Sequence, residues 1–281
     1  MALHRSFQTA RRCPLQSFLR SMHVLIPLQV SAASYSVPST STRVVPNNVT
    51  DSAVHTLLER AIAQRHPTQA LQCLAQLHTS PGAPLLQKLA ILLARQKKTS
   101  RHDALRAFEI LRGVYRLPCL KPDDYTKLAS IYVLDACVRH SMLDHAMELY
   151  DEALNQAVVL DLPAYDGLLK ALVKQKRMEE AMEVLKALVR GEDLCPMETT
   201  FVPVLIKLIE TREYDEAINV LQQGQKRGVV FTSTTFHPLL TLAEEDTVST
   251  DSLIKFLSFI EDAWEECKDF DVEEYEDDLN D

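Results

Sequence analysis

The chain has 281 residues with a net charge of −9, and only 6 of its residues are glycine. With 46% hydrophobic residues and no alternating β-branched runs, this composition predicts an all-helical protein. The six cysteines form no CxxC pair, which argues against a zinc or disulfide framework, and no apolar run reaches the roughly 20 residues that span a bilayer.

The charge is distributed unevenly along the chain. Residues 1–50 carry five arginines and no acidic residue, whereas residues 261–281 carry twelve acidic residues and one lysine. The part between them is nearly neutral. Charge alone therefore neither demands nor excludes a polyanionic partner.

The N-terminal 45 residues have the composition of a targeting segment. This segment combines arginine, serine and apolar residues and contains no acidic residue. A helix would place Leu3, Phe7 and Ala10 near one face and Arg5 and Arg12 away from that face. This pattern is typical of a mitochondrial transit peptide. We expect residues 1–45 to be a transit peptide and linker and the protein to reside in the mitochondrial matrix. A disordered basic tail remains the alternative.

Helical periodicity begins near residue 51 and continues to residue 267. Turn sequences such as His66-Pro67 and Lys121-Pro122-Asp123 separate the apolar-periodic segments. The predicted helices pair as hairpins: 53–65 with 68–77, 85–95 with 104–115, 125–139 with 143–156, 163–174 with 178–190, and 199–210 with 214–227. A sixth unit begins at Thr234. Residues 252–267 form a last helix that is expected to cap the array, followed by a disordered acidic tail, 268–281.

The hairpins repeat with a nearly constant period. Ala146, Ala181 and Ala217 lie at equivalent points 35 and 36 residues apart, each ahead of an apolar pair, and Tyr165 and Phe201 are also 36 residues apart. Two amphipathic helices per repeat of this length are typical of helical-hairpin solenoids. The sequence therefore predicts an all-α, right-handed α-solenoid over residues 51–267, in which Tyr165 and Phe201 occupy matching places.

Four short segments share a recognisable pattern: an aromatic residue followed by a leucine pair, an acidic–alanine helix, a glycine near a helix end, and Lys-Pro-Asp. The segments are Tyr165-Asp166-Gly167-Leu168-Leu169, Glu180-Ala181-Met182-Glu183-Val184-Leu185, Lys226-Arg227-Gly228-Val229 and Leu120-Lys121-Pro122-Asp123. On these segments, residues 120–235 resemble pentatricopeptide repeats (PPR). The chain lacks the tryptophan and the Gly-x2-Tyr of the tetratricopeptide pattern, and some other helical-hairpin solenoid remains the alternative.

The resemblance implies that the array binds single-stranded RNA, with one nucleotide read by two side chains of each repeat. The family reads bases mostly with Thr, Ser or Asn paired with Asp or Asn. None of the three pairs in this chain matches, and valine or isoleucine cannot hydrogen-bond a base edge, which argues against base-specific readout. The pairs are Asp166 with Met197, Val202 with Thr232, and Ile131 with Asp161.

Basic residues on and near the first helices are candidate phosphate contacts. The family often has a lysine late in the first helix, and the equivalent residues here are Arg139, Lys174 and Glu210. Each phosphate neutralised is expected to steepen the salt dependence of binding by about one unit. A solvated polar helix face is the alternative. The candidate RNA-binding residues are Arg139, Lys170, Lys174, Lys176, Arg177, Lys207 and Asp166.

No glycine-rich phosphate loop and no GxSxG motif occurs in the chain, so the sequence predicts no enzyme, no catalytic residue, no metal and no cofactor. The resemblance implies a role in organellar RNA metabolism or translation, as a subunit or associated factor of the mitochondrial ribosome. The expected partners are single-stranded or ribosomal RNA and ribonucleoprotein subunits, with no membrane and no small-molecule substrate. A helical-repeat adaptor that binds only proteins is the alternative.

Overall fold

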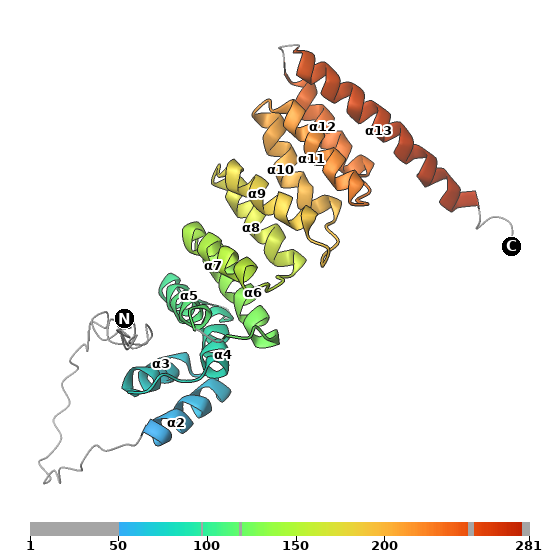
Figure 1. Ribbon diagram of the computed structural model, residues 1–281. Coiled ribbons are helices and arrows are strands. Elements are labelled where there is room, and N and C mark those ends of the chain that lie inside the picture. The colour runs from blue at the N-terminus through green and yellow to red at the C-terminus, as the bar shows by residue number, and fades with distance from the viewer. Residues whose placement is uncertain (1–50, 97, 118–119, 247–249, 277–281) are drawn as a thin grey trace, which may run out of the picture. The chain divides into compact units, whose positions relative to one another are not determined.

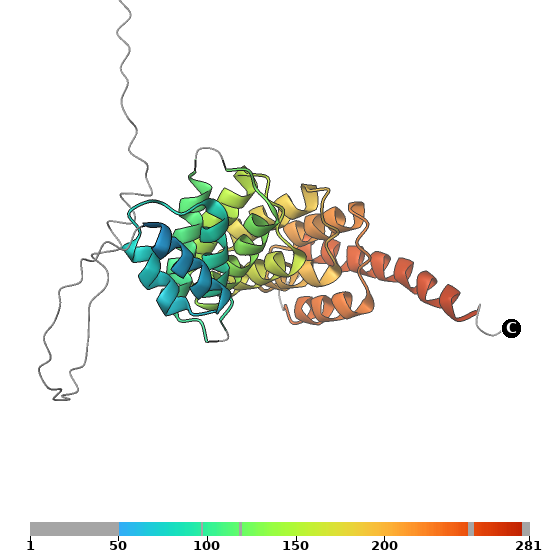
Figure 2. The same cartoon turned by 90° about the horizontal axis from the view of Figure 1, so that it is seen from below.

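The computed structural model describes residues 51–96, 98–117, 120–246 and 250–276, with side chains up to residue 265. These residues form α-helices joined by short connections, and no strand occurs among them (Figure 1 and Figure 2). The helices are α2 (Asp51–Ala63), α3 (Pro67–Gln76), α4 (Ala83–Ala94), α5 (Arg101–Tyr115), α6 (Asp124–Arg139), α7 (Leu143–Asn155), α8 (Leu162–Lys174), α9 (Met178–Arg190), α10 (Glu198–Glu210), α11 (Tyr214–Lys226), α12 (Ser233–Glu244) and α13 (Asp251–Glu276).

The observed helix bounds follow the predicted ones closely. Helix α9 has the predicted bounds, and α7, α8, α10 and α11 differ from the prediction by one residue at one end. Helix α5 begins earlier than predicted because Ser100 caps it, accepting a hydrogen bond from the Asp103 N–H at 3.1 Å. The prediction of an all-α helical-repeat fold is confirmed. The predicted transit peptide lies outside the described residues.

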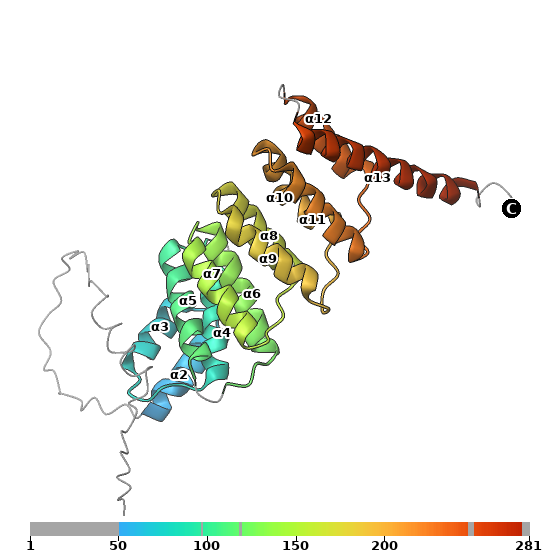
Figure 3. The same cartoon turned by 45° about the horizontal axis from the view of Figure 1, so that its top comes forward.

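The chain divides into two compact units, Met1–Ala136 and Cys137–Asp281. In the first unit α2 pairs with α3 and α4 pairs with α5, while α4 also contacts both helices of the first pair. In the second unit α8 pairs with α9 and α10 pairs with α11 (Figure 3). Helix α10 contacts both α8 and α12, so the first helices of these repeats form one row.

The turns inside the α6–α7, α8–α9 and α10–α11 hairpins each use a residue with a left-handed backbone. Ser141, Lys176 and Arg212 have φ values of 55°, 61° and 63°, at intervals of one repeat. In the second of these turns the N–H of Arg177 bonds to the carbonyl of Leu172, five residues back, at 3.0 Å. This is the hydrogen bond of a Schellman motif, which satisfies the carbonyl groups left open where a helix ends. The same left-handed turn residue therefore reverses the chain in these three successive hairpins.

Three aromatic residues occupy the fourth position of successive first helices. Tyr165 in α8, Phe201 in α10 and Phe236 in α12 are buried, with exposed fractions of 6%, 0% and 1%. The predicted equivalence of Tyr165 and Phe201 is confirmed. Phe231 lies between two of these rings: its centroid is 5.4 Å from that of Phe201, edge-on, and 6.3 Å from that of Phe236. Such aromatic contacts add about 0.5–1.5 kcal/mol each beyond their buried area, so they tie one repeat to the next.

Helix α13 packs against both α11 and α12. The Phe256 ring is fully buried with its centroid 5.7 Å from that of Tyr214, and the Trp264 ring stacks on Phe236 at 6.4 Å. The apolar stripe of this helix therefore covers the last hairpin, as a terminal element of a repeat array must.

The backbone of α13 continues to Glu276, whereas the sequence predicted a disordered tail from residue 268. Extending an existing helix adds one hydrogen bond per residue without a new nucleation step, and glutamate is a good helix former. The acidic composition therefore did not end the helix. Residues 277–281 lie outside the described part of the chain.

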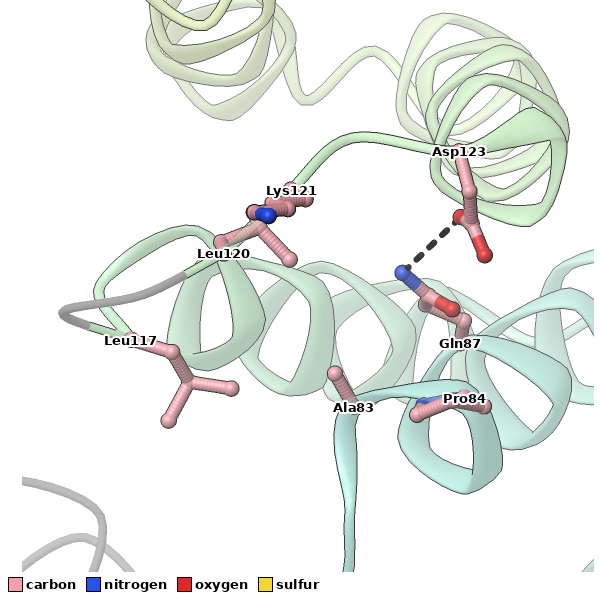
Figure 4. A pocket seen from close by; sticks show the side chains of 7 residues that line it. All are labelled: Ala83, Pro84, Gln87, Leu117, Leu120, Lys121 and Asp123. Atoms are coloured by element: carbon pink, nitrogen blue, oxygen red, sulfur yellow. Dashed lines mark hydrogen bonds between the residues drawn. The ribbon is translucent and has the colours of Figure 1, made fainter.

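The segment Lys121-Pro122-Asp123 leads into α6 (Figure 4). The Asp123 carboxylate accepts a hydrogen bond from the Thr126 N–H at 2.8 Å, and the Thr126 hydroxyl accepts one from the Asp123 N–H at 3.1 Å, a reciprocal cap. Gln87 of α4, only 2% exposed, donates to the Thr126 hydroxyl at 2.8 Å, and its amide nitrogen points toward Asp123. These contacts fix the start of α6 against α4.

Candidate nucleic-acid interface

One side of α8 carries three of the predicted RNA-binding residues. Asp166, Lys170 and Lys174 lie four residues apart, so they follow one face of a helix that has 3.6 residues per turn. Both lysines are exposed, and neither has an ion-pair partner in the part of the chain that the structure describes. Two uncompensated ammonium groups are therefore available on this face, suited to phosphate oxygens.

The equivalent positions on α6 and α10 do not carry the same charge. On α6 they hold an apolar residue, an acid and Arg139, which is exposed and engaged with a neighbouring group. On α10 they hold Val202, Ile206 and Glu210, so the last position is an anion. Of these three helices, only α8 therefore carries two lysines at the compared positions.

Two other predicted cations are held by carboxylates. Arg177 forms ion pairs with Asp144 of α7 and Glu180 of α9, both at 2.7 Å, and Lys207 pairs with Glu210 at 2.7 Å. A phosphate would have to compete with these carboxylates. Lys176 is exposed, but it is the left-handed residue of the α8–α9 turn. RNA contact at all seven residues stays a prediction.

Two side chains at the predicted base-reading positions form hydrogen bonds where a helix begins. Asp161 caps α8 by accepting a hydrogen bond from the Ala164 N–H at 3.1 Å. Thr232 is the N-cap residue of α12, but its side chain makes no capping hydrogen bond; its hydroxyl donates instead to the Glu198 carboxylate at 3.1 Å. Only Asp166 keeps a buried carboxylate oxygen with no hydrogen-bond partner in the described residues. Base readout at these positions stays untested.

A second basic cluster was not predicted from the sequence. Lys186, Arg190, Lys226 and Arg227 line a hollow of about 410 Å³ between α9 and α11, which are second helices of their repeats. The Arg227 guanidinium donates to the backbone carbonyl of Gly191, which places it at the end of a helix. Cations at helix C-termini are stabilised by the helix dipole, so this cluster has a structural role without any ligand. The spacing of Arg190 and Lys226, 36 residues, would have revealed it.

Comparison with known families identifies the repeats. The family model described as the PPR repeat matches residues 132–156 and 164–191. The chain contains pentatricopeptide repeats. Among solved structures, the crystal structure of the pentatricopeptide repeat protein PPR10 from maize is similar, with a TM-score of 0.47 and 16% sequence identity. That match covers 77% of this chain and 31% of the maize chain, so this chain spans less than a third of that structure. A comparison with curated proteins finds no match.

Within the described residues, no three His, Cys, Asp or Glu side chains come together as a group that could hold a metal ion. In the same part of the chain, no helix combines the length and the apolar character needed to cross a membrane. The buried thiol of Cys137 has its pKa raised to about 12 by desolvation, so it is protonated and unreactive at neutral pH.

Proposed function

We propose that the protein binds single-stranded or ribosomal RNA without base selectivity, and that it acts in mitochondria as a subunit or associated factor of the mitochondrial ribosome. The observation that carries the RNA role is the pair of uncompensated lysines, Lys170 and Lys174, on a first helix inside a matched PPR repeat. PPR proteins are generally RNA-binding and non-enzymatic, which supports this assignment.

Contacts with the phosphate backbone fit this surface better than readout of bases. Phosphate contacts supply affinity that is independent of sequence and weakened by salt. Four of the reading positions in this chain hold Val202, Ile131, Asp161, whose carboxylate caps α8, and Thr232, whose hydroxyl bonds to Glu198. A protein fixed in a ribonucleoprotein particle needs affinity for its neighbours more than recognition of a sequence.

A salt titration of RNA binding tests the RNA role. The full-length chain is mixed with fluorescent homopolymers of U, A and C, and anisotropy is followed over a series of potassium chloride concentrations. The variant Lys174→Glu should weaken binding to all three homopolymers about equally and lower the salt slope by about 0.7 per lost phosphate contact. Lys255→Glu, an exposed cation on α13, is the matched control and should change little.

Two results would contradict the RNA role. No binding by the wild-type chain at low salt would remove it, and a loss at Lys174 for one homopolymer alone would show base readout in place of backbone contact. For the location, a fluorescent reporter fused to residues 1–45 should enter mitochondria, and the native protein should sediment with mitochondrial ribosomal particles. A cytosolic reporter would contradict the proposed targeting.

A protein-only adaptor is the second candidate function. The ion pairs of Arg177 and Lys207 favour it, because they leave less free positive charge than the sequence alone indicates. An adaptor would sediment with particles after ribonuclease treatment has removed exposed RNA. It would also show no binding to the RNA homopolymers at any salt concentration.

A further inference from the structure

A groove in the first unit is bordered by α2, α4 and α6. It has a volume of about 630 Å³ and is lined by the cations Arg65, Lys88 and Arg95, together with Tyr125, Leu128 and aliphatic residues such as Ile91. None of the described residues that line it is acidic. We call the groove that these residues line the N-terminal groove. It lies before residue 132, where the matched PPR repeats begin.

Rings and cations are presented together on this surface. The Lys88 ammonium lies 5.2 Å from the centroid of the Tyr125 ring, and the Arg95 guanidinium lies 5.5 Å from that of Tyr132. Tyr125 is 46% exposed and Leu128 is 40% exposed. Cation–π attraction holds each cation beside its ring. An exposed apolar surface of this kind with fixed positive charge is typical of a binding site.

Tyr125 is exposed because α6 is longer at its start than the other first helices. Ser130 occupies the place of Tyr165, 35 residues earlier, and it bonds to the Tyr115 hydroxyl at 2.6 Å. Tyr150, 35 residues after Tyr115, likewise meets the Tyr165 ring at 5.9 Å. Helix α6 begins six residues before Ser130, whereas α8 begins three residues before Tyr165. The additional residues carry Tyr125 beyond the packed core.

We propose that the N-terminal groove binds a segment of single-stranded RNA, with a base stacked on Tyr125 and phosphates held by Lys88, Arg95 and Arg65. The inference rests on the proposed RNA role and adds a second contact region in a unit that the PPR matches do not reach. Aromatic stacking accepts any base, because every base has a π-face, so this region binds without sequence preference. Its affinity combines stacking with counterion release.

An acidic peptide is the other occupant that three cations would accept, and the chain's own acidic C-terminal segment is an example. The exposed ring favours RNA, because each nucleotide supplies one flat base and one phosphate side by side, matching a ring with a cation beside it. A peptide of mainly carboxylates would engage the cations and leave the Tyr125 face open.

The test uses the full-length chain with fluorescent homopolymers of U and A over a range of salt concentrations. Tyr125→Leu keeps an apolar side chain and removes the stacking ring, so it should weaken binding about tenfold with no change in salt slope. Lys88→Glu should weaken binding and lower the slope by about 0.7 or more. Arg60→Glu is the control, since this exposed arginine of α2 lies about 200° around the helix from Ile62, which lines the groove.

The outcomes separate this proposal from the general RNA role. Wild-type binding that falls with Lys174→Glu but not with Tyr125→Leu or Lys88→Glu would leave the RNA role standing and overturn the groove. A fluorescent peptide of residues 266–281 is run alongside. If Lys88→Glu releases that peptide while RNA binding is unchanged in both groove variants, the groove is a peptide site and the proposal is wrong. Circular dichroism at 222 nm confirms that each variant is folded.

Discussion

Two glycines inside first and second helices should respond in opposite ways to the same substitution. Gly224 lies in α11, and a Cβ added there would stand 2.6 Å from Cζ and 2.8 Å from Cε2 of Phe231, with Cε1 of Phe201 at 3.3 Å. Gly167 lies in α8, and a Cβ added there would meet no atom within 4 Å. Alanine therefore tests the packing around the aromatic residues directly.

The expected size of the effect follows from the burial of the two rings. Phe231 would have to move by roughly 1 Å to restore ordinary contact, yet Phe231 and Phe201 are 2% and 0% exposed. Overpacking of this kind costs about 1–3 kcal/mol, and replacing a helical glycine returns about 1 kcal/mol. We expect Gly224→Ala to lower the free energy of unfolding by up to about 2 kcal/mol and Gly167→Ala to raise it by about 0.5–1 kcal/mol.

Fluorescence of the single tryptophan, Trp264, reports unfolding of the second unit, because its ring stacks on Phe236. Urea denaturation followed by this fluorescence gives the midpoint for each variant. Adding Phe231→Leu to Gly224→Ala should recover part of the loss, which a double-mutant cycle measures as a coupling energy. If Gly224→Ala raises stability as much as Gly167→Ala does, or if both variants lose stability equally, the packing of Phe231 against α11 is refuted.

Two further changes test the helix ends. Glu198 accepts hydrogen bonds from the Thr232 N–H at 2.9 Å and the Thr235 hydroxyl at 2.8 Å, and although burial raises the pKa of this carboxyl, these bonds outweigh it and the pKa is lowered. A lowered folded-state pKa means that the stabilisation is present above the unfolded pKa of about 4.3 and is lost as pH falls through the folded value. Glu198→Gln should therefore lower the free energy of unfolding in urea by about 1–2 kcal/mol at pH 7 and by much less in acid. An equal loss at both pH values would contradict this reasoning. Ala157 has a φ of 54°, a left-handed conformation that costs a non-glycine residue about 1–2 kcal/mol. Ala157→Gly should therefore raise the midpoint of thermal unfolding. A lower midpoint would show that the backbone is not strained there.

The period of the chain could be read from the sequence because it appears in single residues. The spacing of Tyr165 and Phe201 predicted their matching burial, and Ala146, Ala181 and Ala217 are all fully buried in the second helices. Small residues fill these points because two helices approach each other there, and the same contact recurs in each repeat. Local periodicity was sufficient for the helices and their pairing.

Which cations of the candidate site are left without a carboxylate partner could not be predicted from the repeat period alone. The pairing of Arg177 with Asp144 joins residues 33 positions apart, less than one period, so no repeat-based alignment brings them together. The pairing of Lys207 with Glu210 does follow from a three-residue helical spacing. The N-terminal groove depends on the early start of α6, which changes which residues face out, and no periodic pattern contains that information.

The end of each repeat is subject to two requirements that compete for one side chain. Capping the next helix requires an acceptor turned back onto the first N–H groups, whereas reading a base requires the same acceptor turned outward. In this chain Asp161 is turned back onto the Ala164 N–H, and the Thr232 hydroxyl is held by Glu198 at the start of α10. A side chain that forms a hydrogen bond within the repeat array stabilises the fold and is not available to hydrogen-bond a base. Under the proposed RNA role, affinity would then come from phosphate contacts at cations such as Lys174 and from stacking on exposed rings.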